Sequence, residues 1–237
     1  IMDRPDTSPP TMMQRILASD FVFDFTRAPL AMLAAAVVLF LFIIAILAPL
    51  VAPTNPFDPA SLNLMNGFTP PMTPNMFTGQ SFVMGTDDQG RDLLSAIIYG
   101  LRVSLFVGVM SVLLAMGIGV SLGLVAGYVG GWLDNLIMRI ADIQLTFPSI
   151  LIAMLIFGVL RGIIPPDLRD EMAIFVLIAA IGLSEWVPFA RTVRATTLVE
   201  KEKEYVQAAR LIGLRRGQIM WRHILPCLLY TSPSPRD

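Results

Sequence analysis

The sequence predicts an all-α membrane protein, a polytopic bundle of transmembrane helices, and three observations support this fold class. Hydrophobic residues make up 55% of the 237 residues and charged residues only 15%, whereas soluble domains average about 25% charged residues. The charges are also unevenly spread, so that long apolar runs lie between them. The mean hydropathy is +0.68. We therefore expect lipid, and not water, to surround most of the chain.

Four runs without a charged residue predict the transmembrane helices. They cover residues 28–57, 103–133, 143–160 and 172–184. A helix needs about 20 apolar residues to cross roughly 30 Å of hydrocarbon, so the first two runs suffice by themselves. The third suffices if its helix begins near Asn135, and the fourth suffices if its helix continues past Glu185 to about Ala190. Four spans are therefore expected.

A further stretch without charge, residues 59–86, is not expected to span the membrane. It is rich in Pro, Asn, Thr and Gly, which leave backbone groups that lipid cannot satisfy. Prolines from Pro49 onward end the first helix. We therefore expect a folded external loop over residues 53–102.

The distribution of Lys and Arg predicts which side of the membrane each end faces. The N-terminal segment, residues 1–27, carries three Arg, and the segment from Arg191 to Arg222, after the fourth run, carries eight Lys or Arg. The loops after the first and third spans carry more acidic than basic residues. Positively charged loops stay in the cytoplasm, so both ends are expected there, as an even number of spans requires.

The residue counts argue against several other functions. A formal net charge of -1 gives no basic surface of the kind that binds nucleic acid. The sequence contains one His and one Cys, His223 and Cys227, with Pro226 between them and no third ligand, so neither a metal site nor a disulfide is predicted. No catalytic residues are predicted, and without a Walker A pattern the chain is not expected to bind ATP as a cofactor.

Residues 197–226 predict two short helices joined by a glycine turn on the cytoplasmic side. Helix-forming residues fill 198–212, Gly213 has the place of a left-handed C-cap, and a second helical stretch covers 215–224. Two small side chains, Ala208 and Ala209, would let another surface approach the first helix closely. From the residues alone, an amphipathic helix lying on lipid headgroups is the alternative, because the charge and the amphipathic pattern suit it equally well.

The same segment resembles the EAA loop, E-A-A-x(3)-G-x(9)-I-x-L-P, of permease subunits in ABC importers. The residues at the matching positions are Gln207, Ala208, Ala209, Gly213, Leu225 and Pro226. The sequence departs from the motif at Gln207, where the motif has Glu, and at His223, where it has Ile. The resemblance implies a coupling helix that docks in a groove of a cytoplasmic ATPase and passes its closure to the membrane helices.

A second resemblance lies just before the second span. Residues 85–105 are similar to the G-T-D-x-x-G-R-D-x-x-S signature of the dipeptide/oligopeptide permease family. The matching residues are Gly85, Thr86, Asp87, Asp88, Gly90, Arg91, Asp92 and Ser95. We expect the four charged residues among them to form a local ion-pair and helix-capping network. Direct contact with substrate is the alternative.

Together the resemblances imply a multi-pass permease subunit in a bacterial inner membrane, part of an ATP-driven importer of peptides or similar small solutes. The implied partners are a homologous second permease, two cytoplasmic ATPase subunits that bind ATP, an external solute-binding protein and membrane lipid. Dipeptide, oligopeptide, nickel chelate and glutathione all remain open as substrates. A stand-alone channel or secondary transporter, and a membrane-embedded enzyme, are the competing hypotheses.

The family also implies six spans where four are visible. Residues 28–226 are therefore expected to form part of a transmembrane domain. Residues 227–237 contain Ser, Pro and Arg where a fifth span should begin, and we expect them to be a non-native tail of a truncated chain.

Several residues inside the predicted spans carry more specific expectations. The glycines of the second span, Gly108, Gly117, Gly119, Gly123 and Gly127, predict close helix packing. Pro148 predicts a kink in the third span. Two acidic residues lie near the hydrocarbon, Asp142, which Arg139 could neutralise, and Glu185, which Arg191 could neutralise. Glu185 is a candidate residue of the transport pathway.

Overall fold

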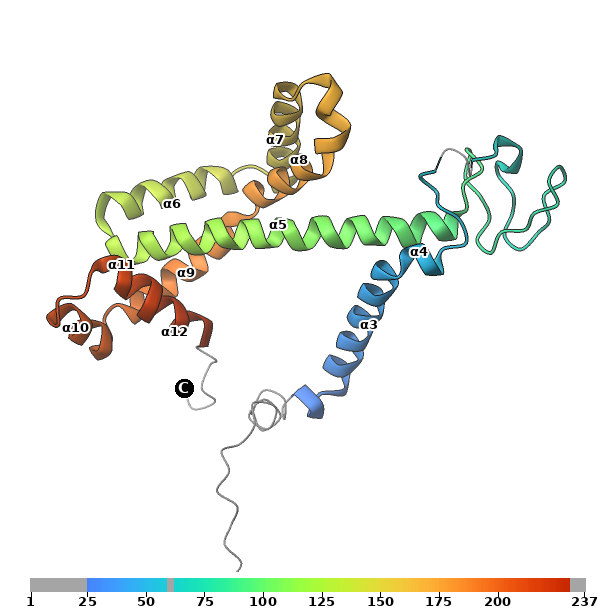
Figure 1. The fold of residues 1–237 in the computed structure, drawn as a ribbon. Helices are drawn as coiled ribbons and strands as arrows, with labels where there is room; N and C mark the ends of the chain where they lie inside the picture. The colour runs from blue at the N-terminus through green and yellow to red at the C-terminus, as the bar shows by residue number, and fades with distance from the viewer. Residues whose placement is uncertain (1–24, 59–61, 231–237) are drawn as a thin grey trace, which may run out of the picture. The chain divides into compact units, whose positions relative to one another are not determined.

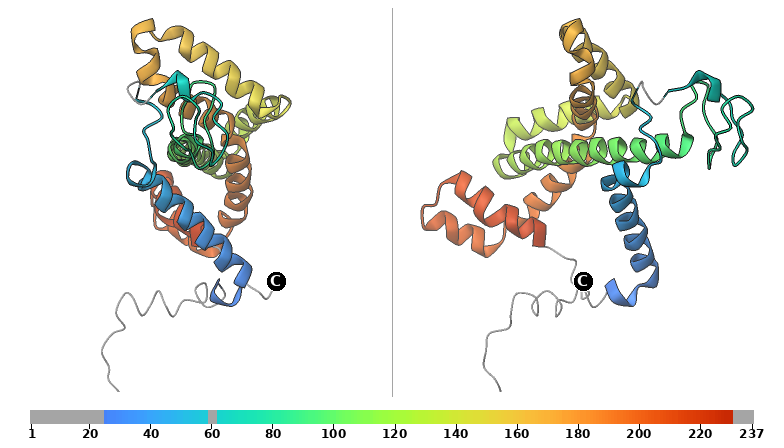
Figure 2. Two further views of the ribbon diagram at one scale, coloured as in Figure 1. Left: turned by 90° about the vertical axis from the view of Figure 1, so that its right-hand side faces the viewer. Right: turned by 45° about the vertical axis from the view of Figure 1, so that its right-hand side comes forward.

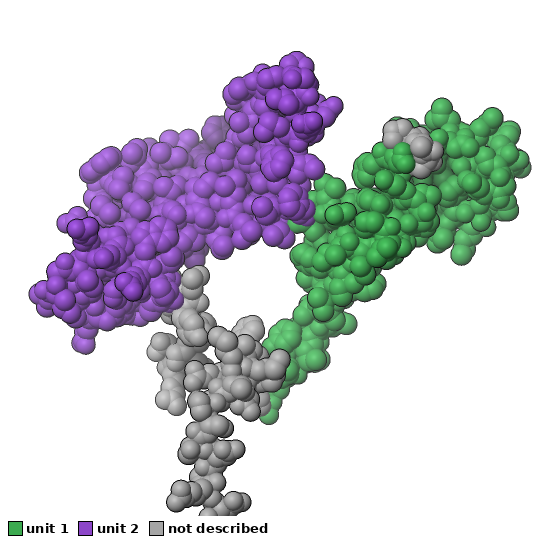
Figure 3. Space-filling view, in the orientation of Figure 1, with its two compact units in different colours: residues 1–105 green, residues 106–237 purple. Residues whose placement is uncertain are grey.

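A computed structural model describes residues 25–58 and 62–230 of the chain (Figure 1). The chain divides into two compact units, residues 1–105 and residues 106–237 (Figure 3). Within the described ranges every regular element is helical, and β pairing is limited to two isolated bridges. The all-α prediction is therefore confirmed. The basic residues before residue 25 and the end of the expected non-native tail, residues 231–237, lie outside the described residues.

The first unit contains a membrane helix followed by a folded loop. α3 (Pro29–Ile46) begins with a proline, which is tolerated in a first turn because no backbone N–H is needed there. A break at Leu47 separates it from the short helix α4 (Ala48–Val51). α3 has a mean hydropathy of 2.9, and Ala45 is its one buried residue. A helix so apolar and so uncovered requires surrounding lipid.

The loop between α4 and α5 (Leu93–Val129) is built from short turns. It contains a 3-10 turn, η2 (Leu64–Asn66), and an isolated bridge between Pro74 and Ser81. α5 begins at Leu93, so residues 93–102, which were expected in the external loop, form its first turns. The expected boundary was set by Arg102, the last charged residue before the apolar run. The helix itself begins at Leu93, directly after Asp92, which caps its first turn.

α5 is the longest helix in the described part of the chain. It has 37 residues and is therefore about 55 Å long at 1.5 Å per residue, more than the roughly 30 Å of a bilayer core. Residues 93–105 of this helix belong to the first unit and the remainder to the second. α3 and α5 are each long and apolar enough to cross a membrane, as predicted for the first two spans.

The third predicted span is two helices instead of one. α6 (Gly131–Leu145) and α7 (Ser149–Ile163) meet at an angle of 99° across residues 146–148. Pro148 has no backbone N–H to donate, and it disfavours a helical conformation of the preceding residue. The helix therefore stops at this point. The prediction of one kinked helix from near Asn135 to residue 160 is wrong.

The fourth predicted span is divided as well. After the 3-10 turn η3 (Pro166–Leu168), α8 (Arg169–Ser184) is followed by α9 (Trp186–Glu200), with a bend of 41° between them. The pair ends ten residues later than the predicted end at Ala190. α7 and α8 pack side by side as a hairpin (Figure 2). The described residues thus contain two spans, or up to four if each bent pair is one span.

Four short helical elements follow α9. They are α10 (Glu204–Leu211), α11 (Arg216–Ile219), the π-helical turn η4 (Met220–Ile224) and α12 (Leu225–Tyr230). The predicted helix over 198–212 is interrupted at residues 201–203, because α9 ends there and α10 starts in a new direction. The second predicted helix, 215–224, corresponds to α11 and η4.

Thirteen of the buried apolar residues of the second unit form two clusters, both built on α5. The first cluster comprises Leu124, Tyr128, Val206, Ala209, Ile219, Met220 and Ile224. The second comprises Ala126, Ile137, Ala141, Trp186, Val187 and Ala190. α5 is therefore the helix on which both the short C-terminal helices and the α6–α9 pair are assembled.

Candidate functional site

Helix α10, in the segment expected to couple to a partner, is ended by its glycine. Gly213 has a φ of +83°, a left-handed conformation that glycine adopts without steric cost. Its N–H donates to the carbonyl of Arg210 at 3.0 Å, and the N–H of Leu214 donates to the carbonyl of Ala209 at 3.2 Å. These two bonds form a Schellman motif. The predicted C-cap is confirmed, and the spacing from Ala209 to Gly213 is the spacing that closes a helix.

The outer side of α10 is uncovered. Gln207 and Ala208 are exposed, and the side-chain amide of Gln207 donates to the carbonyl of Glu202 at 2.9 Å. At the end of the helix, Leu211 is 89% exposed and Ile212 is 78% exposed. Two neighbouring aliphatic side chains with so little cover indicate a surface that another molecule can occupy.

The inner side of α10 packs on the first of the two clusters built on α5. Ala209 is buried in that cluster and Leu225 packs against it, so the structure brings these two motif residues together. Pro226 is exposed and follows the π-helical turn. His223, where the motif has Ile, is only partly buried, whereas the next residue, Ile224, is fully buried. The apolar role of that motif position has therefore moved by one residue.

A buried carboxylate joins α9 to α10. Glu200 is only 3% exposed, and it accepts hydrogen bonds from Lys203 Nζ at 2.6 Å and from the Tyr205 hydroxyl at 2.8 Å. The hydrogen bond to Glu200 raises the pKa of Lys203. Burial, together with the hydrogen bond to Glu200, raises the pKa of Tyr205. Both donors therefore keep their protons at neutral pH. The turn between α9 and α10 is stabilised by both hydrogen bonds to Glu200.

A neighbouring lysine attaches the same turn to α5. Lys201 Nζ donates to the carbonyl of Gly127 at 3.2 Å, close to the C-terminal end of α5, where cations are favoured by the helix dipole. The turn between α9 and α10 thus contacts the long helix as well as its own two helices.

α5 and α9 approach each other closely along one face of α5. The glycines on this face are Gly119, Gly123 and Gly127. A Cβ on Gly123 would lie 2.4 Å from the carbonyl oxygen of Ala190, which is too close for any side chain. The predicted packing role is confirmed for these three glycines. It is not supported for Gly108 and Gly117, where a Cβ would meet nothing within 4 Å.

Polar side chains bind α6 to α9. Arg194 donates to Asp134 from Nε at 2.5 Å and from Nη2 at 2.7 Å, and Arg191 donates to Asp142 at 2.5 Å. The two helices run antiparallel, which brings Asp142 beside Arg191. The predicted pairing of Arg191 with Glu185 is therefore wrong, and so is the assignment of Arg139 as the partner of Asp142.

The glycines and threonine of the external-loop signature hold the loop together. Gly85 and Gly90 have φ values of +80° and +76°, and a Cβ on Gly90 would lie 2.0 Å from the carbonyl oxygen of Asn63. The Thr86 hydroxyl accepts a hydrogen bond from the backbone N–H of Thr69 at 2.9 Å. These three signature residues are required by the path of the backbone.

The charged residues of the signature form a compact network. Asp87 accepts hydrogen bonds from the backbone N–H of Arg91 at 2.9 Å and from its Nε at 2.8 Å. Burial alone would raise the pKa of Asp87, but the bonds from Arg91 outweigh it and lower that pKa. Asp92 accepts from the N–H of Ser95 at 3.0 Å and from its hydroxyl at 2.5 Å, which caps α5. The expected network is present, although Asp88 is exposed and outside it.

Comparison with known proteins identifies the family of the chain. Residues 119–231 match the family described as "Binding-protein-dependent transport system inner membrane component", and residues 17–71 match "N-terminal TM domain of oligopeptide transport permease C". The Dipeptide transport system permease protein DppC of Haemophilus influenzae is 35% identical over 93% of this chain and 70% of its own length. The chain belongs to the permease subunits of ABC peptide importers.

Two further relatives of the permease are named for other solutes. The Oligopeptide transport system permease protein OppC of Bacillus subtilis is 33% identical over 89% of this chain and 62% of its own length. The Glutathione transport system permease protein GsiD of Escherichia coli is 39% identical over 87% of this chain and 62% of its own length. This permease is thus a multi-pass inner-membrane protein from a family whose members are named for different solutes.

The permease carries one acidic residue at a break between membrane helices. Glu185 is partly buried at the bend between α8 and α9, and it makes no side-chain hydrogen bond with the described residues. Within residues 25–58 and 62–230, no group of three or more His, Cys, Asp or Glu is placed to hold a metal ion.

Sequence reasoning missed two acidic residues that join helices of the permease: Glu200, which joins α9 to α10, and Asp134, which joins α6 to α9. Glu200 and Lys203 are three positions apart, a spacing that favours an ion pair on a helical turn, so that contact could have been found. Asp134 and Arg194 are 60 positions apart, and no local pattern connects them.

Proposed function

We propose that this chain is the permease subunit of an ATP-driven importer of peptides or similar small solutes, and that α10 docks on a cytoplasmic ATPase subunit. The names of the relatives support the solute class. ATP would be bound and hydrolysed by two ATPase subunits. A second, homologous permease subunit and an external solute-binding protein would complete the importer, which agrees with the family's description as binding-protein-dependent.

The observation that carries the docking proposal is the two-sided character of α10. Its inner side is anchored by Val206 and Ala209 in the cluster on α5. Its tip carries Leu211 and Ile212, which are exposed directly before the glycine turn. A short helix held firmly on one side, with aliphatic side chains projecting on the other, fits insertion into a groove of a partner.

The contacts behind α10 support a route for the movement. Glu200 and Lys201 fix the turn to α9 and α5, and the glycine face leaves no space between those two helices. A pull on α10 would therefore move α9 and α5 together. Closure of the ATPase subunits would in this way reach the membrane helices and drive alternating access.

The direction of transport needs a defined orientation, and we infer that the N-terminus and α10 both lie in the cytoplasm. The excess of Lys and Arg in these two segments supports this orientation. Glu185 lies at a helix break in the membrane domain, and we propose that it lines the solute pathway.

On the opposite side, the external loop is our proposed contact for the solute-binding protein. Large apolar side chains are exposed on it, and Met76 is 98% exposed. Phe68 and Met72 have φ values of +55° and +54°, which are strained for residues other than glycine. Replacing Met76 and Phe77 with serine should reduce the stimulation of ATP hydrolysis by the binding protein. Unchanged stimulation would exclude this contact.

The docking proposal is tested in the full-length importer with Leu211→Asp and Gly213→Asp. The first change places a charge on the exposed tip without disturbing the core. The second forces a side chain into a left-handed conformation, at a cost of about 1–2 kcal/mol. In both variants the ATPase subunits should fail to co-purify, or should hydrolyse ATP without solute uptake.

Gly217→Asp is the matched control for this experiment. Gly217 lies in α11, where an added Cβ meets nothing within 4 Å and the backbone is helical. This variant should therefore assemble and transport normally. Normal coupled uptake by the Leu211→Asp and Gly213→Asp variants would refute the docking role of α10.

A further inference from the structure

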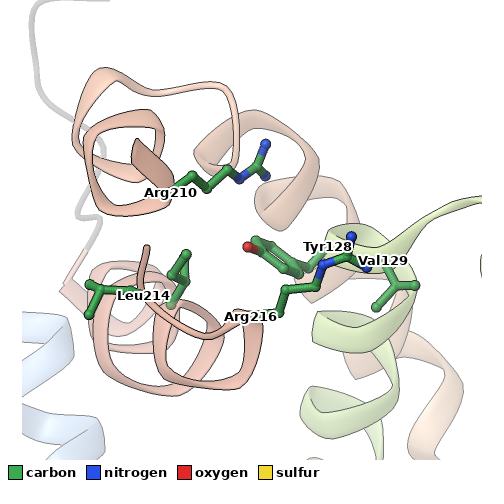
Figure 4. Close-up of a pocket in the computed structure, with 6 residues that line it drawn as sticks. Tyr128, Val129, Arg210, Leu214 and Arg216 are labelled. Carbon is green, nitrogen blue, oxygen red and sulfur yellow. The ribbon is translucent and has the colours of Figure 1, made fainter. Parts of the chain in front are cut away.

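A hollow lies where α10 and α11 meet the end of α5. Its volume is about 340 Å³, and its lining residues are Tyr128, Val129, Arg210, Leu214, Arg216 and Ile219 (Figure 4). Tyr128 and Val129 come from the last turn of α5, and the other four residues come from the short C-terminal helices and the turn between them. The hollow therefore combines the end of a membrane helix with a basic segment of the chain.

Two guanidinium groups border this hollow without an acidic partner. The Arg210 guanidinium carbon lies 5.2 Å from the centre of the Tyr128 ring, a cation–π contact that orients the group but leaves its charge. Neither Arg210 nor Arg216 forms an ion pair with any carboxylate of the described residues. Arginine binds phosphate oxygens through several N–H groups at once. The hollow thus has the charge and the donors of a phosphate site.

The position of the hollow points to phosphate that belongs to a lipid. Val129 is the last residue of α5, and Trp132, just beyond it, is 75% exposed. Trp and Tyr side chains collect at the boundary between hydrocarbon and water. Phospholipid phosphates lie at that boundary all around a membrane protein, and basic pockets beside membrane helices bind anionic headgroups.

We propose that this hollow binds the phosphate of an anionic phospholipid, with Arg210 and Arg216 as its ligands. Tyr128 supports the first guanidinium, and the apolar end of α5 at Val129 faces the acyl chains. A carboxylate of a partner protein would also suit two guanidinium groups. Val129, at the end of the apolar helix α5, and the exposed Trp132 just beyond it favour the lipid. This inference does not require the docking role proposed for α10.

The test compares lipid retention by the complete importer purified in detergent. Phosphatidylglycerol and phosphatidylcholine are supplied in equal amounts, and native mass spectrometry measures how much of each stays bound. The double variant Arg210→Gln/Arg216→Gln should lose the preference for phosphatidylglycerol, by roughly five-fold for each arginine. The double variant Arg210→Lys/Arg216→Lys, which keeps both charges, should retain most of the preference.

The matched control is Arg139→Gln/Arg222→Gln, which removes two exposed arginines outside the hollow. It should retain phosphatidylglycerol like the unchanged protein. Equal retention by Arg210→Gln/Arg216→Gln would overturn the proposal.

Two further outcomes would replace the lipid with another ligand and would also overturn the proposal. Release of the bound phosphatidylglycerol by excess inorganic phosphate would mean that the site takes any small anion. Loss of ATPase co-purification in Arg210→Gln/Arg216→Gln, with lipid retention unchanged, would assign the hollow to a protein carboxylate. Co-purification is scored separately from lipid retention, so the docking proposal is judged independently.

Discussion

A single methyl group at Gly123 tests whether α5 and α9 are in backbone contact. In the Gly123→Ala variant the new Cβ would lie 2.4 Å from the carbonyl oxygen of Ala190 and 3.0 Å from its Cα. Backbone atoms cannot rotate away, so α9 must move outward by roughly 1 Å to restore ordinary van der Waals contact. Overpacking of this kind costs about 1–3 kcal/mol. Because α9 leads into α10, uptake should fall together with stability.

Gly117→Ala is the matched control in the same helix. A Cβ at Gly117 meets nothing within 4 Å, so this variant should gain up to about 1 kcal/mol from the better helix propensity of alanine. The gain applies equally to Gly123→Ala and cancels in the comparison. The difference between the two variants should therefore be about 1–3 kcal/mol.

Thermal unfolding of the full-length protein in detergent measures this difference. Each kcal/mol corresponds to about 2–4 °C in the midpoint for a chain of this size, so Gly123→Ala should unfold several degrees below Gly117→Ala. Equal midpoints would show that α5 and α9 are not packed backbone to backbone, and the proposed route of movement would lose its support.

The remaining predictions concern the polar contacts. In Glu200→Gln an amide NH2, which cannot accept a hydrogen bond, replaces one of the two carboxylate oxygens that accept from Lys203 and Tyr205. The variant should lose about 1–3 kcal/mol in thermal unfolding, while ATP hydrolysis persists with reduced uptake; full uptake would contradict the role of this turn. Arg194→Gln leaves Asp134 without its partner, and should destabilise the protein more at low salt than at high salt; salt-independent midpoints would argue against the pair. Arg91 lowers the pKa of Asp87 in the folded state. The Asp87 carboxylate therefore stabilises the folded loop fully above the pKa of the unfolded chain, near 3.8, and this stabilisation is lost as pH falls through the lower pKa of the folded state. Limited proteolysis of the external loop should therefore accelerate below about pH 4, and Asp87→Asn should abolish that pH dependence; an unchanged pH profile in the variant would exclude Asp87.

Much of the membrane organisation could be predicted from the spacing of charges. The first two spans were recognisable because the bilayer sets a minimum apolar length, and α3 and α5 exceed it. The prediction of the third span as one helix is wrong because a count of charged residues takes no account of which residues can continue a helix. Pro148 has no N–H to donate, and at this position the consequence is a break of 99°.

The candidate site was predictable where the signal is local. Gly213 and Asp92 act within one helical turn of their own position, so a C-cap and a helix start could be read from neighbouring residues. The contacts between helices were not predictable in this way. Asp142 pairs with Arg191 because α6 and α9 run antiparallel, a fact that no window of sequence contains.

The way α10 ends has a consequence for what its motif can encode. Gly213 ends the helix in a left-handed conformation, and Ala209 is buried in the cluster on α5, so the identity of both residues follows from the structure of this chain and would be the same for any partner. Under the docking proposal, discrimination between one ATPase and another would then depend on the exposed side chains beside them, with Leu211 and Ile212 the first to examine. Exchanging those two side chains between related permeases would then be the direct way to change which ATPase subunit the proposed docking helix selects.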